Sequence, residues 1–144
     1  MIDNSRIPFT DIAKKLLISA GTVHVRVKKM EEFGIIKGAS LALDYKKLGY
    51  TFIAYIGIFL EKTHLTNYVL EKLDSIPYAT VAHITTGRFN IFCKVRCKDT
   101  DHAKEIIFMI DDIEGVSRTE TMISLEESIN DKKRLMHKIF NEIK

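Results

Sequence analysis

The chain has 144 residues, of which 46% are hydrophobic, so it can form one domain or two small ones around buried cores. No apolar run is long enough to span a membrane, and no charged-then-apolar signal segment opens the chain. These features exclude a membrane protein and predict a cytoplasmic one without a membrane partner.

Charge is unevenly distributed, although the formal net charge is only +3. Residues 1–40 hold seven Lys and Arg against four Asp and Glu, residues 41–129 hold ten against thirteen, and residues 130–144 hold five against two. The three parts therefore carry +3, −3 and +3. Basic ends around an acidic middle indicate separate functions, and a polyanion is the expected partner of a basic end.

No residue set is typical of a metal site or of catalysis. Cys93 and Cys97 lie four apart in a strand-like segment, about 13 Å at strand rise, too far for a disulfide. The five histidines lack metal-spaced partners, and no phosphate loop or nucleophile motif is present. We expect packed free thiols, no metal, no cofactor and no catalytic residue. An enzyme is the main rival interpretation, because ferredoxin-like domains host many activities.

Two short amphipathic segments at the N-terminus predict a helix-turn-helix. Residues 9–16 place apolar side chains on one helical face. Ser19 is placed to accept hydrogen bonds from the free amides of a second helix that runs to about residue 33. Gly34 is placed as its left-handed C-terminal cap, before a short extended stretch at residues 35 and 36. The apolar stripe of this second helix consists of Val23, Val27 and Met30.

The second helix carries basic residues off its apolar stripe. In a helix-turn-helix this helix lies in the DNA major groove, so we expect double-stranded DNA as a partner. The candidate DNA-binding residues are Ser19, Thr22, His24, Arg26, Lys28 and Lys29. We expect Thr22 and His24 to contact bases, and the basic side chains to divide between phosphates and base edges. An ordinary helical hairpin with a solvated basic face is the alternative.

From residue 51 the order of predicted elements is β-α-β-β-α-β, the ferredoxin-like arrangement. The strands are predicted over residues 51–60, 80–86, 90–97 and 116–125, and the helices over residues 65–76 and 99–113. The first strand is apolar on both alternating faces, which predicts cover on both sides. Two helices cover only one face of a four-stranded sheet, so we expect a homodimer built sheet to sheet.

The predicted fold class is α+β, an N-terminal (winged) helix-turn-helix followed by a ferredoxin-like βαββαβ domain. The expected parts are a DNA-binding domain at residues 1–40, a linker at 41–50, a ligand-binding and oligomerisation domain at 51–127, and a helical tail at 128–144. The apolar face of the tail helix consists of Leu135, Met136, Ile139, Phe140 and Ile143.

In this order and spacing the segments resemble the leucine-responsive regulatory protein/AsnC family of transcription regulators, over residues 4–127. The resemblance is carried by "NSRIPFTDIAKKLLISAGTVHVRVKKMEEFGIIKG", by "TTGRFNIFCKV" and by "IEGVSRTETMISLEE". It implies a DNA-binding regulator whose assembly or DNA binding responds to a small effector, an amino acid. It also implies dimers that assemble into octamers. A stand-alone small-molecule-sensing module without DNA binding is the alternative.

The resemblance implies an effector site between dimers, at the turn after the second strand and at the end of the fourth. Carried over residue by residue, the site consists of Ile84, Thr86, Gly87, Arg88, Asn90, Thr100, Met122, Ile123 and Ser124. Asn90 replaces an aspartate that in relatives helps to hold the effector's amino group, and Arg88 adds a positive charge beside it. Hydroxyls and a guanidinium suit the carboxylate of an amino acid, and side-chain oxygens suit its ammonium. A plain hairpin turn with Arg88 in water is the alternative.

Three departures from the family concern the DNA-binding unit. The family begins this unit with a helix of the type "D..D..IL..L" before the segment that matches "NSR", and residues 1–3 cannot hold it. We therefore expect a unit incomplete at its N-terminus, through truncation or a misassigned start. The residues expected to lack an apolar partner are Ile7, Phe9, Ile12 and Val23. Leu17 replaces the usual turn glycine, which predicts a strained left-handed backbone, and Pro8 replaces a helix-capping serine.

Overall fold

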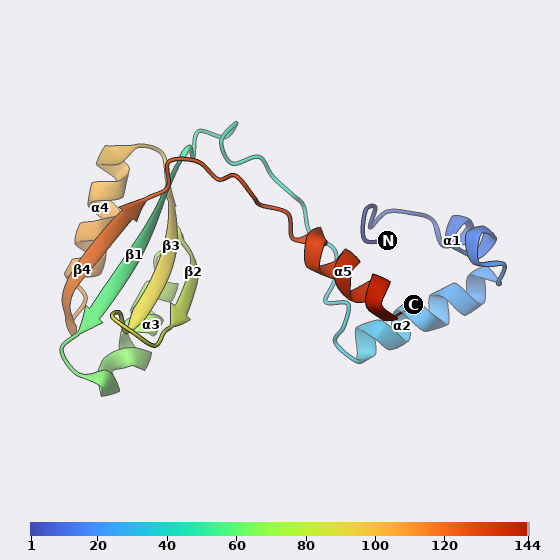
Figure 1. The fold of residues 1–144 in the computed structure, drawn as a ribbon, viewed down its shortest axis with the longest axis horizontal. Helices are drawn as coiled ribbons and strands as arrows, with labels where there is room; N and C mark the ends of the chain where they lie inside the picture. The colour runs from blue at the N-terminus through green and yellow to red at the C-terminus, as the bar shows by residue number, and fades with distance from the viewer. Residues whose placement is uncertain (144) are drawn as a thin grey trace. The chain divides into compact units, whose positions relative to one another are not determined.

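The structure, a computed structural model, describes residues 1–143, which divide into two compact units. The N-terminal unit holds residues 1–42 and the segment from Ile129 onward, and the second unit holds residues 43–128. The predicted C-terminal tail contains helix α5 (Lys133–Ile143), and its contacts group it with the N-terminal unit (Figure 1). No helix among the described residues is long and apolar enough to cross a membrane.

The N-terminal unit contains the predicted helix pair, α1 (Phe9–Leu16) and α2 (Ala20–Glu32). Ala13, Val23 and Val27 are buried between the helices, and Phe9 and Ile12 are half-buried against them. The expectation that Val23 lacks an apolar partner is therefore wrong, because Val23 is only 4% exposed and belongs to this cluster. This core has only three buried residues, so the energy available from apolar burial in the unit is small.

Both predicted caps of α2 are confirmed. The Ser19 hydroxyl oxygen accepts a hydrogen bond from the Thr22 amide at 3.1 Å. At the other end Gly34 has φ +72°, and the Ile35 amide donates to the Met30 carbonyl at 2.9 Å, which closes the helix in a Schellman motif. The extended stretch expected after Gly34 is not a strand, and no strand precedes Phe52 among the described residues.

The turn between α1 and α2 carries the strain predicted at Leu17. Its backbone lies at φ 56° and ψ 43°, and it is the one non-glycine residue with positive φ in the described chain. Its side chain is 92% exposed. Little burial therefore offsets the backbone strain, which costs an ordinary residue about 1–2 kcal/mol.

Replacing Leu17 by glycine is expected to raise the free energy of unfolding of the N-terminal unit by about 0.5–1 kcal/mol. The glycine removes the strain and adds back a smaller loss of backbone entropy. Urea unfolding followed by helical circular dichroism measures the change. Leu16→Gly is the matched control, because Leu16 is also exposed but is the last helical residue of α1, where glycine relieves no strain and costs up to about 1 kcal/mol. Destabilisation by both variants would contradict the assignment of strain to Leu17.

The second unit is the predicted β-α-β-β-α-β domain. Its sheet has the order β2-β3-β1-β4 with antiparallel neighbours. The strands are β1 (Phe52–Leu60), β2 (Ala79–Ile84), β3 (Ile91–Cys97) and β4 (Val116–Ile123). A short 3-10 helix, η1 (Thr63–Leu65), leads into α3 (Thr66–Asp74), and α4 (Thr100–Asp111) follows β3. Helices α3 and α4 lie on the same face of the sheet (Figure 1).

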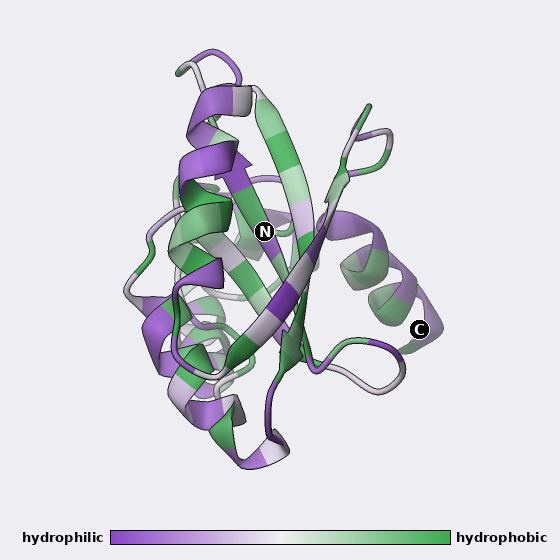
Figure 2. Ribbon diagram, turned by 90° about the vertical axis from the view of Figure 1, so that its left-hand side faces the viewer, coloured by the Kyte–Doolittle hydropathy of each residue, from purple (hydrophilic) through white to green (hydrophobic). Residues whose placement is uncertain are grey.

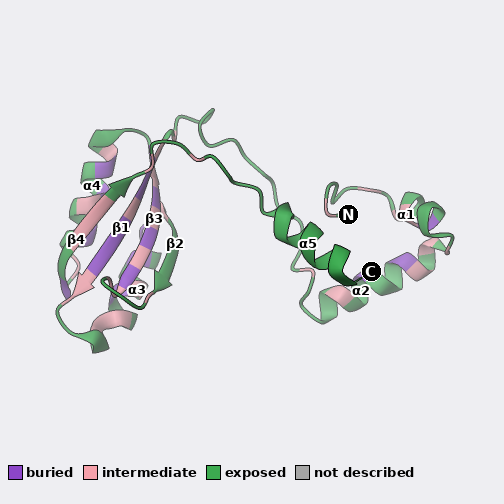
Figure 3. Cartoon of the chain, viewed as in Figure 1, coloured by how far each residue is buried: buried purple, intermediate pink, exposed green. Residues whose placement is uncertain are grey.

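The core of this domain lies between that face of the sheet and the two helices. Buried residues alternate with half-buried ones along β3, whereas β1 is apolar throughout. Figure 2 colours the chain by hydropathy, and burial concentrates in β1, β3 and the inner sides of the helices (Figure 3). Alternation selects the residues of β1 and β3 that face the helices, as the period of a strand requires. These are Ala54, Ile56, Ile58, Ile91, Cys93, Val95 and Cys97.

The two cysteines are free and buried in this core, as predicted. Burial raises the pKa of the Cys93 thiol from its ordinary value of 9.0 to about 11. Burial, together with the nearby carboxylate of Asp99, also raises the pKa of the Cys97 thiol. Both thiols therefore stay protonated and unreactive in the folded protein at neutral pH.

The raised pKa of Cys93 predicts a loss of stability at alkaline pH. Between pH 9 and pH 11 the unfolded chain releases the thiol proton while the folded chain keeps it, so the free energy of unfolding falls as pH rises. The expected loss is about 2 kcal/mol, measured by urea unfolding at both pH values. Cys93→Ala is the control. It is less stable at all pH values because of its cavity, but its stability should depend less on pH. Equal pH dependence of both proteins would contradict the prediction.

The face of the sheet opposite the helices carries aromatic side chains. Tyr55 and Phe92 stack with ring centroids 5.8 Å apart. Phe89 comes from the turn between β2 and β3, meets the Phe59 ring edge-on at 5.2 Å and lies over Gly57. A Cβ atom at Gly57 would come within 2.3 Å of the Phe89 ring. Part of the face expected to pack on a second copy is therefore covered from within the same chain.

Candidate functional site

Helix α2 presents its basic side chains to solvent. Arg26, Lys28 and Lys29 are exposed, whereas Val23 and Val27 are buried on the side that faces α1. The three basic residues thus lie off the core stripe, where a polyanion can reach them. A charged side chain on an exposed helical face can contact DNA phosphates without any rearrangement of the core.

The predicted polar residues of α2 divide into two roles. Ser19 caps the helix, and its hydroxyl lies 2.8 Å from the Thr22 hydroxyl in addition to accepting from the Thr22 amide. Both hydroxyls therefore already have one partner. His24 is exposed, with its ring 5.9 Å from the Phe9 ring of α1. Ser19 and Thr22 hold the first turn in place, and His24 is free to contact a ligand at its outer edge.

Two outward residues of α2 were missed in the sequence analysis. Val25 is 51% exposed and Gly21 is exposed, on the side of the helix opposite the core. The helical period of 3.6 residues predicts the outward position of Val25. Val25 lies two positions from each of Val23 and Val27, so its side chain points away from both. An exposed apolar side chain at this place suits contact with the methyl group of thymine.

The turn between β2 and β3 has a well-defined structure. Gly87 has φ +91°, in the left-handed region that favours glycine. The Asn90 side-chain oxygen accepts a hydrogen bond from the Leu60 amide at 3.0 Å, and the Thr85 hydroxyl donates to the Phe89 carbonyl at 3.0 Å. Asn90 therefore ties the turn to the end of β1, and one lone pair of its oxygen is in use.

The charge that Arg88 adds to this turn is balanced by Glu120, which the sequence analysis missed. The Arg88 guanidinium lies 2.6 Å from the Glu120 carboxylate, which also pairs with Arg118 at 3.1 Å. Arg118 in turn lies over the Phe59 ring, with its guanidinium carbon 3.9 Å from the ring centroid. Two arginines therefore share one carboxylate at this corner of the sheet.

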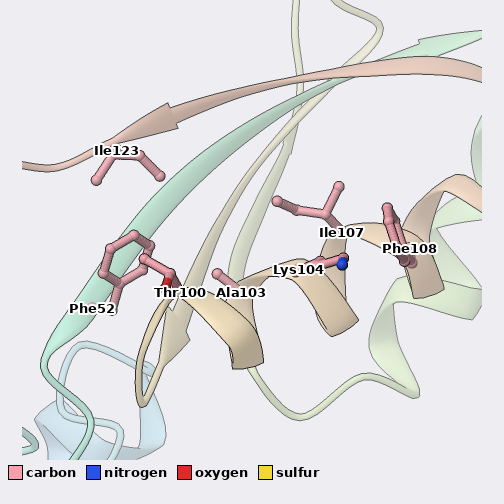
Figure 4. Close-up of a pocket in the computed structure, with 7 residues that line it drawn as sticks. All are labelled: Phe52, Thr100, Ala103, Lys104, Ile107, Phe108 and Ile123. Atoms are coloured by element: carbon pink, nitrogen blue, oxygen red, sulfur yellow. The ribbon is translucent and has the colours of Figure 1, made fainter.

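A shallow apolar pocket of about 180 Å³, largely open to solvent, lies between α4 and the ends of β1 and β4, and we call it the α4 cavity (Figure 4). One face of α4 supplies most of its wall, and Phe52 and Ile123 supply the side of the sheet. Its lining residues are Phe52, Thr100, Ala103, Lys104, Ile107, Phe108 and Ile123. The Thr100 hydroxyl and the Lys104 ammonium are the polar side-chain groups among them. Of the nine predicted effector residues, Thr100 and Ile123 line this cavity.

The remaining predicted effector residues do not gather around the cavity. Ile58 of β1 pairs with Ile91 beside the turn, whereas Ala54 pairs with Ile123 beside the cavity. Four residues of one strand separate the two places, which is about 13 Å. Ile84 ends β2 beside the turn, and the turn itself contains Thr86, Gly87, Arg88 and Asn90. Met122 and Ser124 lie on either side of Ile123, so strand alternation directs them to the open face of the sheet.

A basic helix-turn-helix joined to a βαββαβ domain with an apolar cavity defines a class of DNA-binding proteins that carry a domain for small molecules. Residues 1–37 match the family described as winged helix-turn-helix DNA-binding, and residues 53–133 match the Lrp/AsnC ligand binding domain. The chain is 38% identical to the regulatory protein AsnC of Escherichia coli K12 over 130 residues, 90% of this chain and 86% of that one. It is 37% identical to AsnC of Haemophilus influenzae, over 88% and 85% of the two chains. The chain belongs to the Lrp/AsnC family of transcription regulators.

Solved structures agree with this assignment. The structure of Escherichia coli AsnC superposes with a TM-score of 0.88 at 36% identity, over 91% of this chain and 89% of that one. A Neisseria meningitidis transcriptional regulator, solved as an L-Met complex, superposes with a TM-score of 0.84 over 94% and 91% of the two chains. At 14% identity the second likeness shows the fold alone.

Family membership decides between the interpretations left open by the sequence. The chain is a DNA-binding transcription regulator and not an enzyme. The match of residues 1–37 to a DNA-binding family sets aside the alternative of a sensing module without a DNA-binding unit. Within residues 1–143 no group of three or more His, Cys, Asp or Glu side chains is placed to hold a metal ion.

Proposed function

We propose that the effector of this regulator is an amino acid with an apolar side chain, bound in the α4 cavity. The observation that carries the proposal is the lining of that cavity, whose surface is almost wholly apolar and whose two polar residues are Thr100 and Lys104. An apolar wall suits an aliphatic or thioether side chain. A hydroxyl and an ammonium suit a carboxylate.

The turn between β2 and β3 completes this site from a neighbouring subunit. In one chain the turn lies at the other end of β1 from the cavity, so the predicted residues can form one site only across two copies. The Arg88 guanidinium then offers a second partner for the carboxylate, and Gly87 offers a backbone without a side chain. The L-Met complex of the Neisseria meningitidis regulator supports an amino acid as ligand of this fold.

The subunits form a homodimer through the open face of the sheet, and dimers assemble further to an octamer. Tyr55, Phe92 and Met122 lie on this face, and Met122 is 44% exposed. Half-buried aromatic rings on an uncovered sheet indicate a face that packs on another surface.

In DNA binding, Val25 and His24 contact bases, while Arg26, Lys28 and Lys29 contact phosphates.

A thermal-shift screen of the twenty amino acids tests the effector site. An apolar amino acid is expected to raise the melting temperature and to shift the oligomer distribution seen by sedimentation, because a ligand stabilises the state that binds it. At a ligand concentration of about 100 Kd the stabilisation is about 2.7 kcal/mol. Lys104→Met removes the ammonium beside the cavity. About ten times more ligand is then expected to be needed for the same rise in melting temperature.

Lys72→Met is the matched control. Lys72 lies over the Tyr68 ring of α3 at 5.4 Å, as Lys104 lies over the Phe108 ring of α4 at 5.6 Å, but it is outside the cavity. It is expected to leave the shift unchanged. A shift that survives both Lys104→Met and a cavity-filling Ile123→Trp would place the effector elsewhere. A protein that sediments as a monomer at micromolar concentration with and without ligand would contradict the dimer.

A further inference from the structure

Both connections between the two units reach one arginine. The chain enters the 43–128 unit through a turn at residues 45–49 and leaves it after β4 through residues 124–128. Arg96 lies on β3, and its pairing with Ile53 places it on the open face of the sheet. Its side chain is only 14% exposed, which is low for an arginine outside the core.

On the entering side Arg96 contacts both ends of the turn. Its guanidinium donates a hydrogen bond to the Tyr50 carbonyl at 3.0 Å and lies 5.3 Å from the centroid of the Tyr45 ring. The turn is closed internally, because the Tyr50 amide donates to the Tyr45 carbonyl at 2.9 Å. The Asp44 carboxylate also accepts from the amides of residues 46 and 47. Arg96 therefore fastens a preformed turn to the sheet.

On the leaving side Arg96 shares a carboxylate with its neighbour on the same face of β3. The Glu127 carboxylate lies 3.1 Å from the Lys94 ammonium and 3.9 Å from the Arg96 guanidinium. Lys94 and Glu127 are 23% and 20% exposed, so solvent screens this group less than an ion pair on an open surface. The segment after β4 is thereby tied to the same point as the turn before β1.

We propose that Arg96 is a positioning residue that couples the two units, through a cluster with Tyr45, Tyr50 and Glu127 that we name the Arg96 clamp. The clamp fixes the points at which both connections leave the sheet. Its regulatory meaning rests on the proposed function, a dimer in which an effector controls DNA binding. In such a dimer, fixed attachment raises the effective concentration of the second DNA-binding unit once the first is bound. Arginine suits this role because its planar guanidinium can donate hydrogen bonds to several partners at once.

Trypsin cleavage after Lys46 and Lys47 of the full chain tests the clamp directly. Arg96→Met is expected to increase the cleavage rate at these two bonds about tenfold, because the turn opens locally. Arg96→Lys keeps the positive charge but loses the planar guanidinium with its several donors, so an intermediate cleavage rate is expected. Tyr45→Leu removes the ring without altering the sheet, and an increase is expected here too. Arg118→Met is the matched control: Arg118 also lies over an aromatic ring, near the other end of β1, so no change in linker cleavage is expected.

Binding to two non-specific duplexes tests the coupling. A duplex of about 12 bp offers room for one DNA-binding unit, and one of about 35 bp offers room for two. Arg96→Met is expected to lose about tenfold in affinity for the long duplex and nothing for the short one, whereas misfolding would weaken both. Unchanged cleavage, or faster cleavage with unchanged affinity for the long duplex, would overturn the coupling. A wild-type chain that binds neither duplex would contradict the DNA-binding assignment itself, whatever the cleavage rate shows.

Discussion

Replacing Lys28 and Lys29 together by alanine is expected to weaken binding to any DNA sequence about 30-fold at 0.15 M salt. Each phosphate contact that is lost lowers the slope of log affinity against log salt by about 0.9, so the double variant should lower it by about two. Both side chains are exposed on α2, and neither contributes to the small core beneath it. The folded structure should therefore survive the change. Fluorescence anisotropy on one duplex over a range of salt concentrations measures the affinity and the slope.

Lys62→Ala with Lys72→Ala is the matched control for this prediction. It removes the same charge from exposed positions of the other unit. If α2 contacts the phosphates, the control should change the slope by much less than one. Equal losses in both double variants would mean that net charge alone, and not α2, decides the affinity.

Replacing Gly57 by alanine is expected to destabilise the 43–128 domain by about 2–3 kcal/mol. The added Cβ would lie 2.3 Å from the Phe89 ring, and Phe89 is held against the rings of Phe59 and Phe92. The ring cannot move aside without breaking those contacts. The free energy of unfolding in urea measures the loss.

A double-mutant cycle separates strain from other effects of the substitution. Phe89→Ala alone loses ring contacts, but it also removes the obstacle at Gly57, so the double variant should cost about 1–2 kcal/mol less than the sum of the two single ones. Additive losses would show that the ring does not occupy the space over Gly57. The same contact makes a charged residue at Gly57 a poor probe of dimer formation, because it would disturb the subunit before it reached a partner.

The regular elements followed from local patterns. Helix α1 begins and ends at the predicted residues, and the Ser19 and Gly34 caps of α2 are as expected. The face of β3 that packs on the helices also followed from alternation, because a period of two leaves one choice once one face is apolar. The strain at Leu17 was visible too, since that turn needs a left-handed residue and leucine stands there.

The candidate site was only partly predictable. Thr100 and Ile123 were named from the family resemblance, but nothing local to them indicates that they line one cavity, whose walls come from α4, β1 and β4. Glu120 was missed because its partner Arg88 is 32 positions away in the chain. The outward position of Val25 could have been derived from the helical period.

The sequence by itself determined the elements, their order along the chain, the division of charge into basic ends and an acidic middle, and the buried faces of the helices and of β3, because these depend on neighbours within a few positions. Only the tertiary structure decided which distant residues meet. It placed the predicted turn and the cavity at different ends of β1, laid Phe89 over Gly57, and brought Tyr45, Arg96 and Glu127 together. Such contacts depend on strand register and on the paths of the connections. Both are set by interactions throughout the chain, so they leave no periodic signal in the local sequence.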